Sequence, residues 1–345
     1  MIPIQNIYYM LSYAFQVLNE QGYKNIATEQ FHNTGELMAA ILEKGIAIQL
    51  KRGLGKEYIP QTEALSSLRG KIDIGESIKT QSMLRKQLIC TYDEFSVNST
   101  MNRIIKSTVA LLLRSNISKQ RKKNLRKLMM YFGEVDFIDL HTVNWNVQYN
   151  RNNQTYRMLI SVCYLVVKGL LQTQSDGSTQ LMDFLDEQRM CRLYEKFILE
   201  YYRKEYKNQI TANASQIPWQ LDNEENTMLP VMQSDIMLQH DNRVLIIDAK
   251  YYEHSTQVQF DKHTLHSNNL YQIFTYVKNK EYELREKDHT VSGMLLYAKT
   301  DEEIYPNNVY QMSGNQITVR TLDLNLPFDE IAGQLNTIAK THFDL

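Results

Sequence analysis

The sequence contains few of the residues that mark secreted, disordered or membrane-spanning chains. Its 345 residues include only 3 Cys, 6 Pro and 13 Gly. The cysteines at positions 90, 163 and 191 are far apart and form no Cys-x-x-Cys pair, which argues against a disulfide framework or a zinc site. The longest apolar-rich stretch, 158–171, is shorter than the roughly 20 residues that a membrane-spanning helix needs. These features predict a cytoplasmic protein with no membrane segment.

The sequence also lacks an excess of charge of one sign. It has 38 basic and 39 acidic residues, a net charge of −1, which argues against a histone-like chain wrapped in nucleic acid. The charge is nevertheless unevenly distributed, because residues 1–150 carry 19 basic and 13 acidic side chains whereas residues 151–345 carry 19 and 26. Much of the basic excess lies in a predicted helix at 118–132. Its basic face is either a solvated surface, the more common case, or a contact for phosphate groups.

Hydrophobic periodicity and turn residues predict two domains. The segment 172–180 resembles a linker, so we expect an N-terminal domain over 1–172 and a C-terminal domain over 181–345. The N-terminal domain is predicted to contain five helices, at 7–18, 34–49, 98–113, 118–132 and 156–171, and a β-hairpin-like stretch at 50–74. The C-terminal domain is predicted to contain helices at 185–206, 267–279 and 328–341, with β structure at 228–252 and 293–298. Strands flanked by helices predict an α/β (α+β) fold.

The segment 229–252 contains the residues that suggest chemistry. Asp241-Asn242 lies between two apolar runs, as the turn of a two-residue β-hairpin would. If the turn is centred between these residues, Asp235 lies directly opposite Asp248. Side chains in such a cross-strand pair have Cβ atoms about 4.5–5.5 Å apart. The sequence therefore predicts two carboxylates side by side on one face of a sheet.

Lys250 is predicted to extend this cluster, because alternation along a strand places it on the same face as Asp248, opposite Gln233. Neighbouring carboxylates repel each other unless a cation neutralises them, and Mg²⁺ prefers one or two carboxylates together with water and phosphate oxygens. A lysine beside such a metal can orient the attacking water. The pattern predicts a phosphodiester hydrolase site with Asp235 and Asp248 as metal ligands. The alternative is an ordinary hairpin with a local Asp248–Lys250 ion pair.

Residues on the two flanking helices can complete the site. Glu195, on the preceding helix, is a candidate third acid, although it is equally well explained as an exposed helix charge. Gln272 and Tyr276 lie at positions i and i+4 of the following helix and therefore on one face. They are candidates for contact with the site or with a DNA backbone, with ordinary packing as the alternative.

These residues together resemble a known group of nucleases. Asp235…Asp248-Ala249-Lys250 resembles the PD-(D/E)XK nuclease motif, with Ser234 where the motif has proline, and Gln272-x-x-x-Tyr276 resembles the additional motif of its RecB-like branch. Four further segments, 2–11, 69–73, 102–106 and 246–252, are similar to the McrC family. The resemblance extends from the N-terminus to about Tyr276 and so covers most of the chain.

The resemblance implies an Mg²⁺-dependent endonuclease subunit of an McrBC restriction system directed at modified cytosine in double-stranded DNA. It assigns Asp235, Asp248, Lys250, Glu195 and Gln272 to a PD-(D/E)XK endonuclease domain at 181–345. In such systems GTP is bound by a separate AAA+ partner hexamer, McrB, and this chain indeed contains no G-x-x-x-x-G-K-[ST] loop.

The resemblance further implies that the N-terminal domain docks on the partner hexamer and stimulates its GTPase. The segment 51–74 is the predicted projection, and its basic residues are the candidate stimulating residues: Arg52 first, then Lys51, Lys56 and Arg69. Two alternatives stay open from the sequence. One is a RecB-like repair nuclease that works without a partner, and the other is a chain that serves mainly as a regulatory activator of an AAA+ ring.

Overall fold

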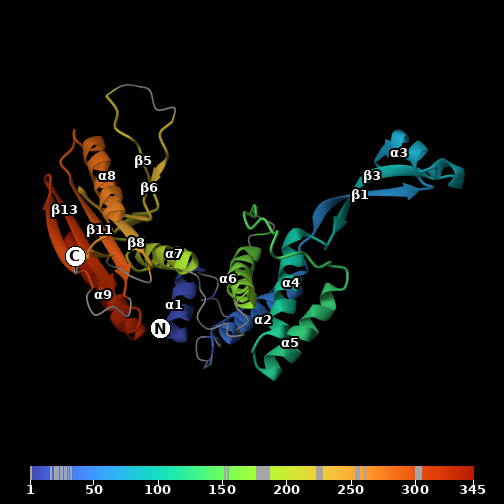
Figure 1. The fold of residues 1–345 in the computed structure, drawn as a ribbon, viewed down its shortest axis with the longest axis horizontal. Helices are drawn as coiled ribbons and strands as arrows, with labels where there is room; N and C mark the ends of the chain where they lie inside the picture. Colours follow the sequence, from blue (N-terminus) through green and yellow to red (C-terminus); the bar gives the residue numbers. More distant parts are fainter. Residues whose placement is uncertain are drawn as a thin grey trace. The chain divides into compact units, whose positions relative to one another are not determined.

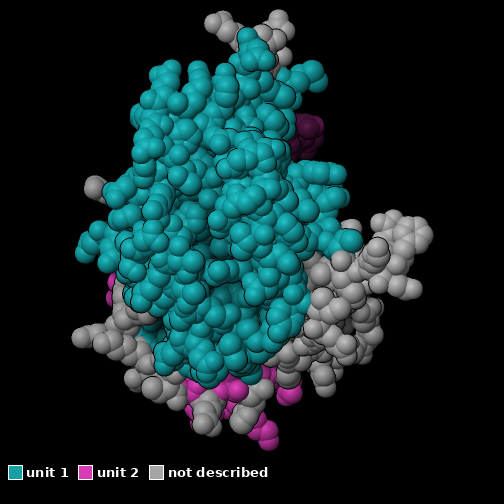
Figure 2. Space-filling view, turned by 90° about the vertical axis from the view of Figure 1, so that its left-hand side faces the viewer, with its two compact units in different colours: residues 1–27, 185–345 teal, residues 28–184 magenta. Residues whose placement is uncertain are grey.

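The computed structural model describes residues 2–15, 18, 23, 26, 29, 31, 33–150, 153, 155–175, 187–222, 228–252, 257–259, 262–299 and 305–345. The chain divides into two compact units (Figures 1 and 2): unit 1 comprises Met1–Ala27 and Leu185–Leu345, and unit 2 comprises Thr28–Phe184. Within the described ranges, no helix is both long and apolar enough to cross a membrane.

The N-terminal helix α1 (Ile4–Ala14) belongs to unit 1, which differs from the predicted assignment of all residues 1–172 to one N-terminal domain. The buried amide of Asn6 donates hydrogen bonds of 2.8 Å to the carbonyl oxygens of both Leu324 and Leu326. The rings of Tyr9 and Tyr13 stack on Phe328. These contacts join the two ends of the chain. Part of the predicted linker, 176–180, lies outside the described residues.

Unit 1 is built on a six-stranded mixed sheet with the order β12-β13-β11-β8-β7-β4. Strand β11 pairs in parallel with β8 and β13, and the other neighbours are antiparallel. The strands are β4 (Thr211–Asn213), β7 (Ile236–His240), β8 (Arg243–Lys250), β11 (Thr290–Ala298), β12 (Asn308–Met312) and β13 (Asn315–Leu322). Two short two-stranded sheets pair β5 (Gln216–Ile217) with β6 (Met232–Gln233) and β9 (Gln257–Gln259) with β10 (Lys262–Thr264). Besides α1, the helices of unit 1 are α7 (Glu187–Glu205), α8 (Ser267–Glu283) and α9 (Phe328–Phe343), so the α/β prediction is confirmed.

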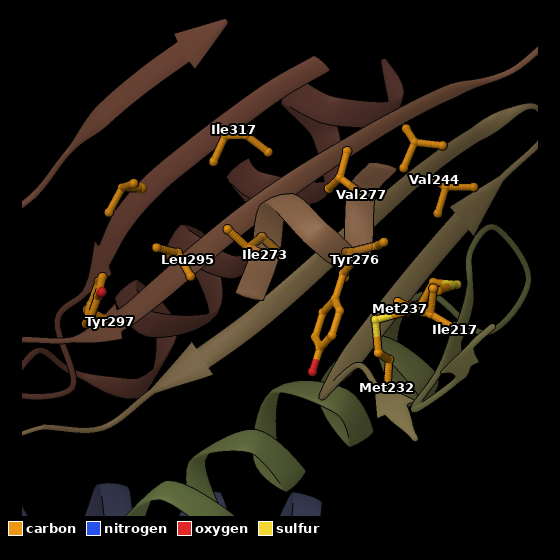
Figure 3. Packing of buried hydrophobic residues seen from close by; sticks show 13 residues of the cluster. Ile217, Met232, Met237, Val244, Ile273, Tyr276, Val277, Leu295, Tyr297 and Ile317 are labelled. Carbon is orange, nitrogen blue, oxygen red and sulfur yellow. The ribbon is translucent and has the colours of Figure 1, made fainter. Parts of the chain in front are cut away.

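Helix α8 packs on one face of the six-stranded sheet (Figure 3). Its Ile273 and Val277 are fully buried in a cluster with residues of four strands of the six-stranded sheet, among them Val244 and Ile246 of β8. Gly293 of β11 permits this approach, because a Cβ atom there would lie 2.8 Å from Ile273 Cγ1. Alternation along β8 places Asp248 and Lys250 on the same face as Val244 and Ile246. The apolar packing therefore fixes the face on which the charged residues appear.

The body of unit 2 consists of helices, four of which were predicted from the sequence. They are α2 (Thr34–Arg52), α4 (Thr100–Arg114), α5 (Lys119–Met129) and α6 (Tyr156–Ser175), and the short 3₁₀ turn η4 (Met130–Phe132) follows α5. The side chains of Asn33, Ser99 and Ser118 cap α2, α4 and α5 by accepting a hydrogen bond from a first-turn amide.

A three-stranded sheet projects from this body (Figure 1), and we call residues 57–96 the wing. It contains β1 (Glu57–Leu65), β2 (Lys71–Asp73), α3 (Ile74–Lys79), η3 (Ser82–Arg85) and β3 (Leu88–Ser96). The predicted hairpin over 50–74 is wrong, because β1 and β2 each pair with β3 and not with each other. The sequence pattern placed β structure correctly but could not identify the distant third strand.

The base of the wing is tied to the helical body by one buried network. The amide nitrogen of Asn102, on α4, donates to the carbonyl oxygens of Gly55 (2.9 Å) and Val97 (2.8 Å). Its oxygen accepts from the hydroxyl of Tyr156, which itself accepts from the amide of Gly55 at 2.7 Å. Both chain segments that enter and leave the wing are thus held by one fully buried side chain, Asn102.

Candidate metal-dependent hydrolase site

The hairpin of β7 and β8 has the register predicted from the sequence. His240 pairs with Arg243 across a two-residue turn, in which Asp241 adopts a left-handed φ of 50°. The last pair of the ladder is Ile236 with Ile247. The next positions outward are Asp235 and Asp248, so the ladder directs these carboxylates to the same face at the end of the hairpin.

Asp248 is a buried carboxylate whose oxygens are not satisfied by hydrogen bonds. Its exposed fraction is 1%, and neither Oδ1 nor Oδ2 has a hydrogen-bond partner among the described residues. The ammonium group of Lys250 lies 2.8 Å from Oδ1, which forms an ion pair without the alignment of a hydrogen bond. A buried carboxylate with free acceptor positions is costly unless it binds something further.

Asp235, which directly precedes β7, lies near the charged groups of Asp248 and Lys250. Its Oδ2 accepts a hydrogen bond of 3.0 Å from the backbone amide of Ala249. Burial, and then repulsion by Asp248 and Glu195, raise the pKa of Asp235 to about 8, although Lys250 opposes the shift. In the metal-free chain at neutral pH, this carboxyl group therefore holds a proton that a cation would displace.

Lys250 remains charged between the two acids. Burial lowers its pKa, but the attraction of Asp248 and Asp235 outweighs burial, so the pKa is raised overall. Its Nζ also donates to Oε1 of Gln272 at 3.3 Å, and Nε2 of Gln272 donates to the hydroxyl of Tyr276 at 2.9 Å. The predicted pair on α8 thus adjoins the lysine, and Figure 3 shows the Tyr276 ring reaching from α8 with its hydroxyl at the far end.

One predicted contact of Lys250 is wrong. Gln233 does not face it, because the strand is interrupted at Ser234 and Gln233 pairs instead with Gln216 in the small β5–β6 sheet. Ser234, the residue that replaces the proline of the motif, is buried and donates its amide to the carbonyl oxygen of Ser215 at 3.0 Å. A proline at this position could not make that hydrogen bond.

Glu195, on α7, completes the acidic group electrostatically. Burial raises its pKa first of all; Asp248 adds to this, while a hydrogen bond from Cys191 and the charge of Lys250 oppose it. The thiol of Cys191 lies 3.0 Å from Oε1 of Glu195 and 3.9 Å from the carbonyl oxygen of Ala249. Burial, followed by Glu195, raises the pKa of Cys191 to about 12, so the thiol is neutral. Cys191 was not among the predicted site residues, although its i, i+4 spacing to Glu195 on a helix is the signal for such a contact.

The donor set fits a hard divalent cation such as Mg²⁺. Across the described residues, no three or more His, Cys, Asp or Glu side chains gather as a ready metal-binding group. Mg²⁺ does not require one, because it is commonly held by one or two carboxylates and completes its octahedron with water and substrate oxygens. Such a cation would bind the oxygens of Asp248 that lack hydrogen bonds and would displace the proton from Asp235.

The four basic residues predicted to stimulate a partner lie at the base of the wing and in one of its loops. Lys51 and Arg52 are exposed in the last turn of α2, and Lys56 is exposed just before β1. Arg69 lies in the loop between β1 and β2, where its guanidinium stacks on the ring of Tyr92 at 4.1 Å. Arg52, the first choice from the sequence, therefore lies at the base of the wing and not on it.

The fold is thus an α/β sheet that ends in two adjacent carboxylates and a lysine. Comparison with known proteins gives the family: a model described as "McrBC 5-methylcytosine restriction system component" matches residues 5–298. The chain is also 30% identical over 335 residues to the type IV methyl-directed restriction enzyme EcoKMcrBC of Escherichia coli strain K12, which covers 94% of this chain and 93% of that protein. The chain belongs to the McrBC restriction-system component family, which confirms the resemblance predicted from its sequence.

Two solved structures from Thermococcus gammatolerans are similar to this chain. One is a half-complex from a tetradecameric assembly of McrB AAA+ hexamers with bound McrC; it has 18% identity and a TM-score of 0.49 and covers 97% of this chain and 76% of that one. The other is a cryo-EM structure of the McrBC complex; it has 22% identity and a TM-score of 0.42 and covers 59% and 58% of the two chains.

Proposed function

We propose that this chain is the endonuclease subunit of its restriction system and hydrolyses phosphodiester bonds of double-stranded DNA with the help of Mg²⁺. The observation that carries the proposal is the Asp235–Asp248 pair with Lys250 beside it. The buried carboxylate of Asp248 and the partly buried side chains of Asp235 and Lys250 converge on one face. Apart from the ion pair with Lys250, the oxygens of Asp248 have no partner of hydrogen-bond geometry among the described residues.

Each residue has a distinct task in this proposal. Asp235 and Asp248 would hold Mg²⁺, whose contribution when bound is to neutralise phosphate charge and acidify water. Lys250 would orient the attacking water and stabilise charge on the phosphate, since its ammonium is fixed between Asp248 and Gln272. Gln272 positions Lys250, and Glu195 adds negative charge that favours a cation in the site.

The test is cleavage of methylated plasmid DNA by the chain together with its GTPase partner. We expect Asp248→Asn and Lys250→Ala each to reduce cleavage by at least 1,000-fold, as roughly expected for loss of a metal ligand or of an oriented nucleophile. GTP hydrolysis by the partner is expected to stay unchanged in both variants. A fully active Asp248→Asn chain would refute the assignment of the site.

We further propose that the wing contacts an AAA+ GTPase hexamer of the McrB kind and stimulates its GTP hydrolysis. Support comes from the family membership, from the lack of a nucleotide-binding loop in this chain, and from the surface of the wing. Large apolar side chains are exposed around its outer end: Leu68 (59%), Ile74 (62%), Ile78 (62%), Met83 (53%) and Leu84 (81%). Apolar side chains concentrated in this way mark a surface for another protein.

The corresponding variant is Ile74→Ser/Ile78→Ser/Leu84→Ser, whose positions are exposed and therefore not needed for folding. We expect stimulation of the partner's GTPase to fall by more than tenfold. A matched control, Met228→Ser/Val231→Ser, removes exposed apolar side chains from unit 1 and is expected to leave the stimulation unchanged. Equal stimulation by both variants would refute this role of the wing.

A further inference from the structure

Helix α5 carries an uninterrupted basic stripe on its outer face. Its members stand at the i, i+3, i+4, i+7 and i+8 positions of one helix face and are Lys119, Lys122, Lys123, Arg126 and Lys127. Four are exposed and Lys122 is half-exposed. Within the parts of the chain that the structure describes, no carboxylate forms an ion pair with any of them.

Arg121, the basic residue on the opposite face of α5, has a structural role in ion pairs. Arg121 contacts three carboxylates at once: Glu36 at 3.3 Å, Glu43 at 2.8 Å, and Glu29. Asn124 also donates to Glu43, at 2.9 Å. The acids of α2 are therefore used on the inner face, where Leu125 is fully buried, and the stripe receives no compensating charge from α2.

This arrangement is unfavourable for the isolated helix. Like charges three and four residues apart repel each other, and α5 itself contains no acidic residue that would relieve the repulsion. Lys119 also stands in the first turn, where the helix dipole disfavours a cation. A bound polyanion would offset both the repulsion within the stripe and the unfavourable interaction of Lys119 with the helix dipole, whereas water and salt only screen these interactions.

We propose that this stripe binds the phosphate backbone of duplex DNA. Lys119 to Lys127 span about 12 Å along the helix, which corresponds to roughly three or four phosphates of one strand. Lysine dominates the stripe, and lysine is depleted in protein–protein interfaces, whereas it is well suited to sequence-independent phosphate contacts. The stripe would thus hold DNA through unit 2, while the hydrolytic site lies in unit 1.

The inference rests on the proposed action on DNA but not on cleavage, so it is tested by binding alone. Fluorescence anisotropy of a labelled 30-base-pair duplex is measured with the full chain in EDTA, between 50 and 200 mM salt. We expect Lys122→Gln/Lys123→Gln/Arg126→Gln to weaken binding 10- to 100-fold at 100 mM salt. The slope of log affinity against log salt is expected to become shallower by about 2 to 3, because three phosphate contacts are lost.

A matched control removes the same charge elsewhere. Lys207→Gln/Lys287→Gln/Lys340→Gln changes three exposed lysines of unit 1, and we expect it to retain the salt slope of the unmodified chain. Equal loss in both triple variants would overturn the proposal, as would an unmodified chain that does not bind the duplex at 50 mM salt. Normal DNA binding by the α5 variant with failed binding to the AAA+ partner would identify an acidic protein surface as the ligand and would also overturn it.

Discussion

Replacement of Asp235 by asparagine should stabilise the metal-free chain at high pH. The folded chain raises the pKa of Asp235 to about 8, above the value of 3.8 for an unperturbed aspartate, because burial and the neighbouring acids disfavour its charge. The folded state therefore binds a proton more tightly than the unfolded state. The stability that this proton provides is complete below about pH 4 and is lost progressively as the pH rises to about 8.

The size of the effect follows from the same difference. The pKa of Asp235 differs by about 4 between the folded and unfolded states, and each pKa unit corresponds to about 1.4 kcal/mol. The gain in unfolding free energy therefore has an upper limit of about 6 kcal/mol. Movement of Lys250 and entry of water reduce this, so we expect Asp235→Asn to gain on the order of 3 kcal/mol at pH 9 and almost nothing at pH 4. The asparagine oxygen can still accept the hydrogen bond from the amide of Ala249, so the local structure is retained.

The assay uses the distribution of the two tryptophans, Trp145 in unit 2 and Trp219 in unit 1. In a Trp145→Phe background, Trp219 fluorescence reports urea unfolding of unit 1 alone. The difference in unfolding free energy between aspartate and asparagine is then measured from pH 4 to pH 9. A difference that does not change with pH would refute the description of Asp235 as a buried acid repelled by its neighbours.

Three further predictions concern residues with defined contacts. Gln272→Ala is expected to lower the rate of cleavage about tenfold without changing KM, because Lys250 loses its hydrogen bond to Gln272. Gln272→Glu retains an acceptor for Lys250 and is expected to retain most of the activity. Equal loss in both variants would contradict a positioning role. Arg121→Ala is expected to destabilise unit 2 by about 2–4 kcal/mol, because three carboxylates lose their partner. The measurement is urea unfolding followed by Trp145 fluorescence. The control Lys122→Ala is expected to change the unfolding free energy of unit 2 little. Gly70→Ala is expected to reduce GTPase stimulation and to leave the stability of unit 1 unchanged. Gly70 has a φ of 67°, and a Cβ atom there would lie 2.3 Å from the carbonyl oxygen of Thr91, so the substitution distorts the wing. Normal stimulation would show that the wing tolerates a shift at this turn.

The sequence predicted the register of the β7–β8 hairpin correctly because its determinants are local. The pairing of Asp235 with Asp248 depends on a two-residue turn and on alternation along two adjacent strands, and both can be read within one short segment. The position of Gln233 was wrong for a related reason. The alternation was extended past Ser234, where the chain leaves the sheet to pair with β5.

Long-range pairing was not predictable in the same way. The sequence marked β structure after α2 but could not show that β1 pairs with β3, because α3 and η3 lie between them. It also assigned α1 to the neighbouring residues in the chain, whereas Asn6 satisfies its amide on backbone carbonyls at Leu324 and Leu326. In both cases the deciding contacts join residues far apart in sequence, and local periodicity carries no information about them.

The proposed binding of a divalent cation by Asp235 and Asp248 can be measured by calorimetric titration of the full chain with Mn²⁺ as a substitute for Mg²⁺. We expect one binding site per chain that is lost in Asp248→Asn and retained in Arg121→Ala, whose contacts lie in unit 2. At pH 7 binding is expected to release close to one proton, because Asp235 is protonated in the metal-free chain. Equal Mn²⁺ binding by the unmodified chain and by Asp248→Asn would show that these carboxylates do not hold the cation.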